Sequence, residues 1–190
     1  LDFQTIAYGK KHFWGYSDLT TVLNAIYAKT GQTGVLYQIR NVLYKEREQQ
    51  MTDVRDVLCE GGDALCRIDY HYVQGTEMHG IIVGGNIRCF LKLSGTAYMP
   101  DLNGKILLLE SRSGTVARME TYLSQLQQIG AFEQIAGILL GTFTEMEAKQ
   151  CMPDIVQLVK KYVRKTMPIA VTKQIGHGTD AKGIVIGGEL

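Results

Sequence analysis

Three residues of this 190-residue chain, a serine, a glutamate and a histidine, could together carry out nucleophilic catalysis. Ser17 lies in the segment His12–Thr20, whose pattern predicts a strand that passes through a tight turn into a helix. A side chain at such a turn faces solvent, and the free N–H groups of the new helix favour developing negative charge. Ser17 could therefore act as a nucleophile, provided that a base accepts its proton.

Glu110 and His177 are the candidate partners of this serine. Glu110 ends the run Lys105–Leu109, which is apolar enough to form a strand buried on both faces. The carboxyl ends of such strands open into the crevice where α/β enzymes hold their site residues. His177 lies between two glycines, on a loop that follows a strand predicted at 168–171. The order serine, acid, histidine is that of α/β-hydrolase-type triads.

Each of these residues also has a purely structural interpretation. Ser17 could be a helix cap, Glu110 could form an ion pair at the end of a strand, and His177 could be an ordinary turn residue. The remaining histidines do not stand out as candidates. His12 neighbours the serine turn but lies within the predicted strand, and His71 and His79 lie in an alternating strand region without a pattern of carboxylates.

Short apolar runs alternate with amphipathic helices along the chain, a pattern typical of α/β or α+β architecture. Helices are predicted at 19–30, 51–59, 87–93, 115–129 and 155–163. Strands are predicted at 34–37, 64–73, 81–83, 105–110, 136–143 and 168–171, and a strand and turn at 182–188. At Gly84-Gly85-Asn86, the two glycines allow a close approach of the backbone or a turn with positive φ.

The predicted fold is α/β, with a partial N-terminal nucleophile-elbow domain joined by a linker to a C-terminal α/β domain. Residues 1–45 would be the remnant that carries the nucleophile, and 46–63 a linker and connecting helix that begins in the charged stretch 45–50. Residues 64–190 would carry the acid and the histidine. The chain begins with Leu1 and enters the serine strand almost at once, so we expect it to be a piece of a longer protein.

Composition narrows the class of partner. The chain is 45% hydrophobic and 21% charged, with a formal net charge of +1, which fits a globular unit and argues against nucleic acid or an anionic membrane as partner. It has neither an apolar run of about 20 residues nor a signal peptide, so we expect a cytoplasmic protein. No zinc or redox motif accompanies the four cysteines, and we expect no metal or cofactor and buried free thiols at Cys59, Cys66, Cys89 and Cys151.

Six motifs resemble, in order and spacing, those of the LD-carboxypeptidases, a serine peptidase family that also includes the microcin C immunity proteins. They are Gly15-Tyr16-Ser17-Asp18-Leu19-Thr20, Gly84-Gly85-Asn86, Ser94-Gly95-Thr96, Leu107-Leu108-Leu109-Glu110, Ile138-Leu139-Leu140-Gly141 with Phe143, and Gly176-His177. The resemblance covers essentially the whole chain.

The resemblance implies a nucleophile at Ser17, a triad acid at Glu110 and a general base at His177, with the N–H of Asp18 as first oxyanion donor. It implies cleavage of an LD-peptide bond, such as that of the terminal D-alanine of a murein tetrapeptide. In the immunity-protein branch the substrates are instead aminoacyl or peptidyl nucleotides. It is also compatible with a homodimer.

The chain departs from the family pattern at two places. Members carry an Arg-Gly-Gly-Tyr-Gly-like loop before the serine strand, and we expect this loop, and a second oxyanion donor with it, to be missing from this chain. Val35–Arg40 occupies the region where members tend to have a Gly-Pro pair. A non-catalytic binding module that kept the fold is therefore the competing hypothesis. A cation for a terminal carboxylate could come from Arg40, Arg112 or Arg118.

Overall fold

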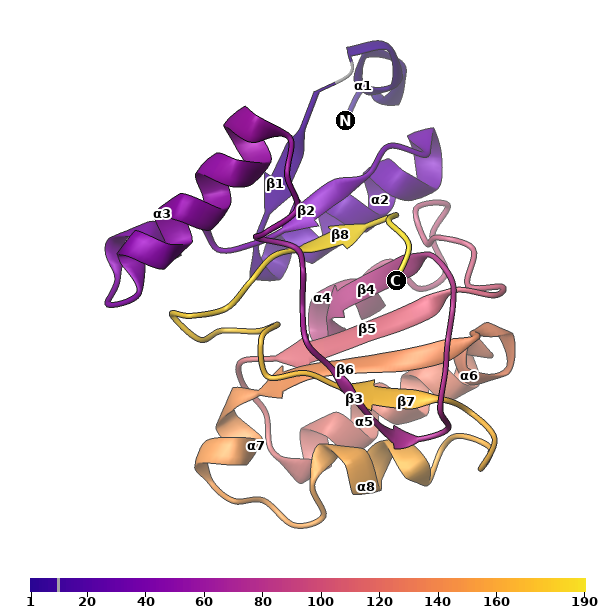
Figure 1. Ribbon diagram of the computed structural model, residues 1–190. Helices are drawn as coiled ribbons and strands as arrows, with labels where there is room; N and C mark the ends of the chain where they lie inside the picture. The colour runs from indigo at the N-terminus through magenta and orange to yellow at the C-terminus, as the bar shows by residue number, and fades with distance from the viewer. Residues whose placement is uncertain (10) are drawn as a thin grey trace.

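The computed structural model describes residues 1–9 and 11–190 and contains two β-sheets (Figure 1). The smaller has the strand order β1-β2-β8 and the larger the order β3-β7-β6-β5-β4. Figure 1 shows the smaller sheet in the upper part of the view and the larger sheet beneath it, with α5 and α8 along the lower side. This mixed arrangement confirms the predicted α/β fold class.

The smaller sheet joins the two ends of the chain. β1 (Phe13–Gly15) runs parallel to β2 (Gly34–Leu36), and β2 pairs antiparallel with β8 (Ile184–Ile186). The helices of this region are α1 (Phe3–Gly9) and α2 (Thr20–Thr30). Because β8 comes from the far end of the chain, the last residues complete the sheet that leads into Ser17. The division of the chain at 45 and 63 remains a prediction.

The larger sheet is mostly parallel and deeply buried. Its parallel strands are β4 (Ile82–Asn86), β5 (Ile106–Ser111), β6 (Gly137–Phe143) and β7 (Ile169–Val171), and the antiparallel β3 (His71–Gln74) lies at the edge. Its helices are α4 (Ile87–Leu91), α5 (Val116–Gln128), α6 (Ala131–Gln134), α7 (Thr144–Ala148) and α8 (Ile155–Lys160). In the described parts of the chain, no helix is long and apolar enough to cross a membrane.

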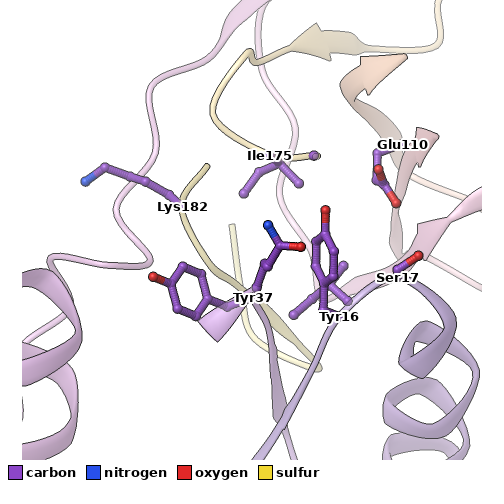
Figure 2. A pocket seen from close by; sticks show the side chains of 9 residues that line it. Tyr16, Ser17, Tyr37, Glu110, Ile175 and Lys182 are labelled. Carbon is purple, nitrogen blue, oxygen red and sulfur yellow. The ribbon is translucent and has the colours of Figure 1, made fainter. Parts of the chain in front are cut away.

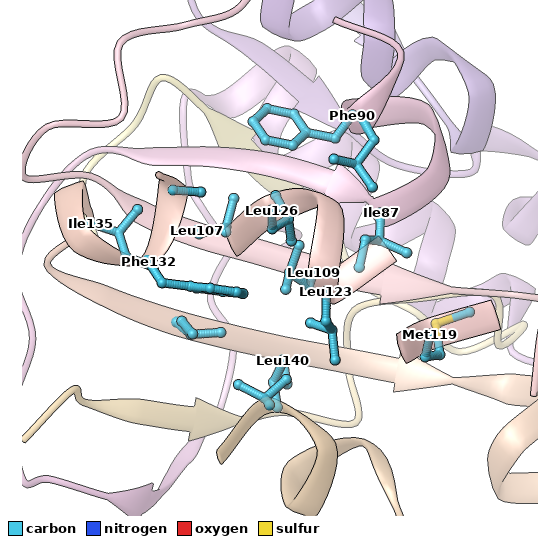
Figure 3. Packing of buried hydrophobic residues seen from close by; sticks show 14 of the residues in the cluster. Ile87, Phe90, Leu107, Leu109, Met119, Leu123, Leu126, Phe132, Ile135 and Leu140 are labelled. Atoms are coloured by element: carbon cyan, nitrogen blue, oxygen red, sulfur yellow. The ribbon is translucent and has the colours of Figure 1, made fainter. Parts of the chain in front are cut away.

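α5 packs on this sheet through an apolar stripe. Met119 and Leu123 of α5 are fully buried and belong to the same cluster as Leu107 and Leu109 of β5 and Phe90 of α4 (Figure 3). Burying each of these side chains contributes about 1.5–3 kcal/mol, so this stripe fixes β5 firmly in the sheet. The carboxyl end of β5, where Glu110 lies, is therefore a rigid support.

Two glycines bring the serine-bearing segment close to the larger sheet. Gly85 has a φ of +128°, and a Cβ built on it would lie 2.8 Å from Oγ1 of Thr20, which leaves no room for a side chain. Asn24 of α2 is fully buried and forms two hydrogen bonds of 2.8 Å with the backbone of Gly84. These contacts dock α2 on β4, and they hold the turn that precedes α2 near the carboxyl end of β5.

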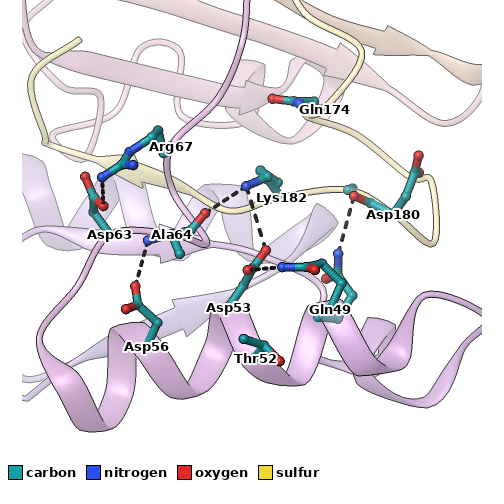
Figure 4. A network of polar contacts seen from close by, with 12 residues as sticks. Gln49, Thr52, Asp53, Asp56, Asp63, Ala64, Arg67, Gln174, Asp180 and Lys182 are labelled. Atoms are coloured by element: carbon teal, nitrogen blue, oxygen red, sulfur yellow. Dashed lines mark hydrogen bonds and ion pairs between the residues drawn. The ribbon is translucent and has the colours of Figure 1, made fainter.

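The region predicted as a linker is largely helical. Residues 46–63, predicted as a linker and connecting helix, contain α3 (Arg47–Arg55) and the π-helical turn η3 (Asp56–Glu60), and η2 (Ile39–Leu43) precedes them, so most of the charged stretch 45–50 is helical. Lys182 ties α3 to the C-terminal segment, because its Nζ donates to the carbonyl of Ala64 at 2.8 Å and lies 3.7 Å from the carboxylate of buried Asp53 (Figure 4). Apolar periodicity missed the start of α3 because its buried side chains are polar.

Two further expectations were wrong. The strand predicted at 64–73 exists only as β3, because the chain turns at 63–67, where the carbonyl of Asp63 accepts from the N–H groups of Cys66 and Arg67. The free cysteines are not all buried: Cys59 is exposed in the last turn before Gly61, whereas Cys89 is buried.

Candidate active site

Ser17 lies at a strained turn between β1 and α2. Its φ is +50°, in the left-handed region that a non-glycine residue rarely adopts, and Tyr16 before it is extended. Gly15 permits this turn, because a Cβ there would lie 2.7 Å from Cβ of Leu19. Within the described residues, neither η1 (Ser17–Leu19) nor α2 has a side-chain cap, so Ser17 does not serve as one. The strained backbone instead directs its hydroxyl toward His177.

The structure brings the three sequence-predicted side chains into one hydrogen-bonded chain. Oγ of Ser17 lies 3.4 Å from Nε2 of His177, and Nδ1 of His177 lies 2.8 Å from Oε2 of Glu110. The side chains of His177 and Glu110 are only 6% and 3% exposed. Figure 2 shows the glutamate beside Ser17 and Tyr16. A proton on Nδ1 satisfies the carboxylate and leaves Nε2 free to accept from the serine hydroxyl.

Asn86 completes the surroundings of the glutamate. Its Nδ2 donates to Oε1 of Glu110 at 3.0 Å, while its Oδ1 accepts from the N–H of Cys89 at 3.3 Å as the cap of α4. This second contact sets the orientation of the Asn86 amide. Both carboxylate oxygens of Glu110 are thus engaged, which a buried carboxylate requires.

Two elements fix the loop that carries His177. Gly176 has a φ of +146° and packs against Thr142, whose hydroxyl a Cβ would hit. On the other side, Nδ2 of fully buried Asn41 donates to the carbonyls of Gly178 and Ala181, both at 3.3 Å. The imidazole is therefore anchored from β6 and from η2.

Tyr16 covers one face of the imidazole. The two ring centroids are 4.8 Å apart with an interplanar angle of 52°. The tyrosine hydroxyl is buried and has no hydrogen-bond partner among the described residues. Burial, and after it the charge of Glu110, raise the pKa of Tyr16, whereas Arg112 and Arg40 act in the opposite direction. Tyr16 therefore stays neutral and limits the movement of the histidine ring.

Asp18, the residue after the serine, turns its carboxylate away from the histidine. Oδ1 accepts from Sγ of Cys89 at 3.0 Å and from Nη2 of Arg88 at 3.2 Å, and these two contacts lower the pKa of Asp18. Its backbone N–H donates to no oxygen of the part of the chain that the structure describes. A free N–H next to a nucleophile can stabilise an oxyanion.

A cavity of about 390 Å³ opens beside Ser17 and His177. Aromatic and aliphatic side chains form much of its wall, and Arg40 and Arg112 supply positive charge. Arg118, the third candidate arginine, lies at a different hollow on the surface of α5. Among residues 1–9 and 11–190, no group of three or more histidine, cysteine or acidic side chains could hold a metal ion.

The sequence indicates the serine, the acid and the histidine, but not the roles of Asn86 and Tyr16. The Gly-Gly-Asn end of β4 stands out as a motif in the sequence, yet the contact of Asn86 with Glu110 depends on the pairing of β4 with β5, which places the two residues opposite each other. The position of Tyr16 over the imidazole has no signal in the sequence.

Two family descriptions match the chain, the LD-carboxypeptidase N-terminal domain over residues 1–38 and the LD-carboxypeptidase C-terminal domain over residues 79–190. A putative carboxypeptidase of Treponema pallidum is 29% identical over 218 residues, which take in 100% of this chain and 64% of that protein. A probable murein peptide carboxypeptidase of Bacillus subtilis is 26% identical over 205 residues, with 98% of this chain and 61% of that protein covered. The chain thus spans less than two thirds of the length of these relatives.

The chain also resembles a solved structure of MccF in complex with glutamyl sulfamoyl guanosine, with a TM-score of 0.83 and 18% identity. That match covers 100% of this chain and 66% of MccF, and it shows a shared fold. Because the C-terminal domain of the family matches more than half of the chain, this protein belongs to the LD-carboxypeptidase family.

Proposed function

We propose that this chain carries the catalytic apparatus of a serine peptidase that hydrolyses an LD-peptide bond, such as that of the terminal D-alanine of a murein tetrapeptide. The observation that carries the proposal is the hydrogen-bonded chain from Ser17 through His177 to Glu110, formed by residues 160 and 67 positions apart. Membership in a carboxypeptidase family supports the reaction class, and the name of the Bacillus subtilis relative supports the substrate class.

The first half of the reaction forms an acyl-enzyme. Oγ of Ser17 attacks the scissile carbonyl carbon, and Nε2 of His177 takes the hydroxyl proton. The oxyanion of the tetrahedral intermediate accepts from the N–H of Asp18. His177 then gives its proton to the leaving amine, the C–N bond breaks, and the terminal amino acid departs.

The second half uses the same groups on water. His177 takes a proton from a water molecule, which attacks the acyl carbon, and it returns that proton to Oγ of Ser17 as the ester breaks. Throughout both halves Glu110 holds the ring with Nδ1 protonated and stabilises the imidazolium. The fixed orientation matters because a ring with its proton on Nε2 could not accept the serine proton.

A second candidate substrate is an aminoacyl or peptidyl nucleotide. The specific observation in its favour is the fold shared with MccF, whose structure was solved with glutamyl sulfamoyl guanosine. The same acyl transfer would serve, with a nucleotide as leaving group. Competition between the two substrate classes in one assay distinguishes them.

The test is release of D-alanine from murein tetrapeptide by the chain and by its Ser17→Ala variant. We expect Ser17→Ala to lower kcat on the order of 10⁴-fold or more, because the variant lacks the hydroxyl that lies beside Nε2 of His177. Ser124→Ala, a serine-to-alanine change in the middle of α5, is the matched control and retains activity.

Two results would contradict the proposal. Unchanged turnover in Ser17→Ala excludes the covalent mechanism. If the unaltered chain binds the peptide but turns over neither substrate class, it is the non-catalytic binding module that competes with the peptidase hypothesis.

A further inference from the structure

The side chains that line the cavity beside Ser17 give it a positive charge. Arg40 and Arg112 line it, and no acidic side chain of the described residues lines it with them. Two carboxylates close to Ser17 and His177 point away from this cavity: Asp18 faces Arg88 and Cys89, and Glu110 is buried behind His177. An anionic group in this cavity would therefore meet two cations and no opposing carboxylate.

Arg112 lies on an anchored part of the backbone. It follows Glu110 by two positions, directly after β5 ends, and its carbonyl accepts from the N–H of Glu145 at 3.1 Å. Its side chain is exposed and has no ion-pair partner among the described residues. The backbone is thus fixed while the guanidinium is available to a ligand.

Arg40 lies across the same cavity on η2. Its Nη2 is 3.5 Å from Oε1 of Gln38, and its guanidinium lies 5.9 Å from the centre of the Tyr44 ring. Neither contact neutralises its charge. Tyr16 forms part of the wall of this cavity, and the positive charges of Arg40 and Arg112 both act on it, because each arginine opposes the rise in the pKa of Tyr16.

The proposed reaction determines where a cation for the terminal carboxylate must lie. In a peptide ending in an amino acid with a free carboxylate, a single Cα atom separates the scissile nitrogen from that carboxylate. A cation that recognises the carboxylate must therefore line the same cavity as the nucleophile. Arg40 and Arg112 meet this condition, and Arg118, which lies at another hollow, does not.

We propose that Arg112, assisted by Arg40, binds the terminal carboxylate of the substrate and so restricts cleavage to the last peptide bond. A guanidinium remains charged at all working pH values and matches a carboxylate with two parallel N–H···O bonds. The apolar wall that includes Trp14, Leu19 and Ile39 would face the uncharged part of the substrate. This inference rests on the proposed function, since it assigns a substrate group to the same site.

The test measures binding in the Ser17→Ala background, so that no turnover interferes. The probes are a peptide ending in D-alanine and the same peptide with a C-terminal amide, with dissociation constants from calorimetry. We expect the acid to bind about 10- to 100-fold more tightly than the amide, the range for a hydrogen bond to a charged group. Arg112→Ala should abolish this preference, Arg112→Lys should keep part of it, and Arg40→Ala should reduce it.

Arg118→Ala is the matched control and keeps the full preference. The inference is overturned if Arg112→Ala retains the preference for the acid, or if the Ser17→Ala protein binds acid and amide equally or not at all. AMP is the third probe: if Arg112→Ala weakens AMP binding but not peptide binding, the arginines serve a phosphate and the carboxylate assignment is wrong.

The outcome is separable from that of the proposed function. Loss of turnover in Ser17→Ala without any effect of Arg112→Ala on acid preference refutes only the carboxylate site. An acid preference that depends on Arg112, together with unchanged turnover in Ser17→Ala, refutes only the serine mechanism.

Discussion

Glu110→Gln exchanges one carboxylate oxygen for an NH₂ group and should nearly abolish turnover. The carboxylate accepts two hydrogen bonds, from Nδ1 of His177 at 2.8 Å and from Nδ2 of Asn86 at 3.0 Å. A glutamine side chain has one accepting oxygen and one donating NH₂ group, so it cannot accept from both. Asn86 cannot rotate to compensate, because its Oδ1 accepts from the N–H of Cys89.

The introduced glutamine cannot accept from both Asn86 and His177, and a change of the histidine tautomer removes this conflict. If the oxygen of the introduced glutamine accepts from Asn86, its NH₂ group faces Nδ1 of His177, which must then be unprotonated. The proton moves to Nε2, which can no longer accept from Ser17. In serine peptidases with an aspartate as the triad acid, exchange of that acid for its amide lowers kcat about 10⁴-fold through the wrong tautomer. We expect a loss of about 10³- to 10⁴-fold here, or about 4 to 5.5 kcal/mol of transition-state stabilisation.

Two measurements check this reasoning. Steady-state kinetics on a peptide ending in D-alanine should show the loss in kcat with KM little changed, and ¹⁵N shifts of the imidazole should show the proton on Nε2 instead of Nδ1. Glu133→Gln, on the exposed surface of α6, is the matched control. The argument would be refuted if urea denaturation shows that the Glu110→Gln protein is folded and its kcat stays within about tenfold of the parent value, a change of about 1.4 kcal/mol.

The remaining predictions concern the support of the histidine loop and the thiols. Asn41→Ala removes the side-chain donor to the carbonyls of Gly178 and Ala181, and among the described residues only the carbonyl of Gly178 keeps another donor, the N–H of Ala181. The free energy of unfolding should therefore fall by about 1–3 kcal/mol, and kcat should fall with it. Urea denaturation and kinetics measure both, and an unchanged kcat would show that the loop does not need this anchor. Burial raises the pKa of the Cys66 thiol to about 11, so about one Cys66 thiol in a thousand is ionised at about pH 8. The alkylation of Cys66 should therefore accelerate about tenfold per pH unit between about pH 8 and 10. Mass spectrometry should find exposed Cys59 modified first, and early modification of Cys66 at about pH 8 would contradict this.

Local sequence patterns were sufficient to predict the helices and strands whose buried side chains are apolar. β5, β6 and α5 lie within one or two residues of their predicted bounds, because a fully apolar run and an apolar stripe at helical spacing are strong signals. The turn at Ser17 was also predictable, since Gly15 precedes it and the apolar positions of α2 follow it.

The same patterns failed where polar groups or distant strands decide the structure. α3 begins at Arg47, earlier than predicted, because its buried positions include Gln50 and Asp53, which periodicity of apolar residues cannot recognise. The segment at 64–73 alternates like a strand, but only its end finds a partner, in β7. A strand forms only where another strand can exchange backbone hydrogen bonds with it, and no local pattern shows where such a partner lies.

By itself the sequence determined the α/β class, the family resemblance and the identity of Ser17, Glu110 and His177 as candidates, because each depends on residue type and short-range spacing. Only the tertiary structure decided that these side chains meet, that Asn86 holds the carboxylate and that Arg112 rather than Arg118 lines the cavity. Those contacts join residues up to 160 positions apart. They follow from the docking of α2 on β4 and the pairing of β4 with β5, where close approach at glycines and burial of apolar surface set the register.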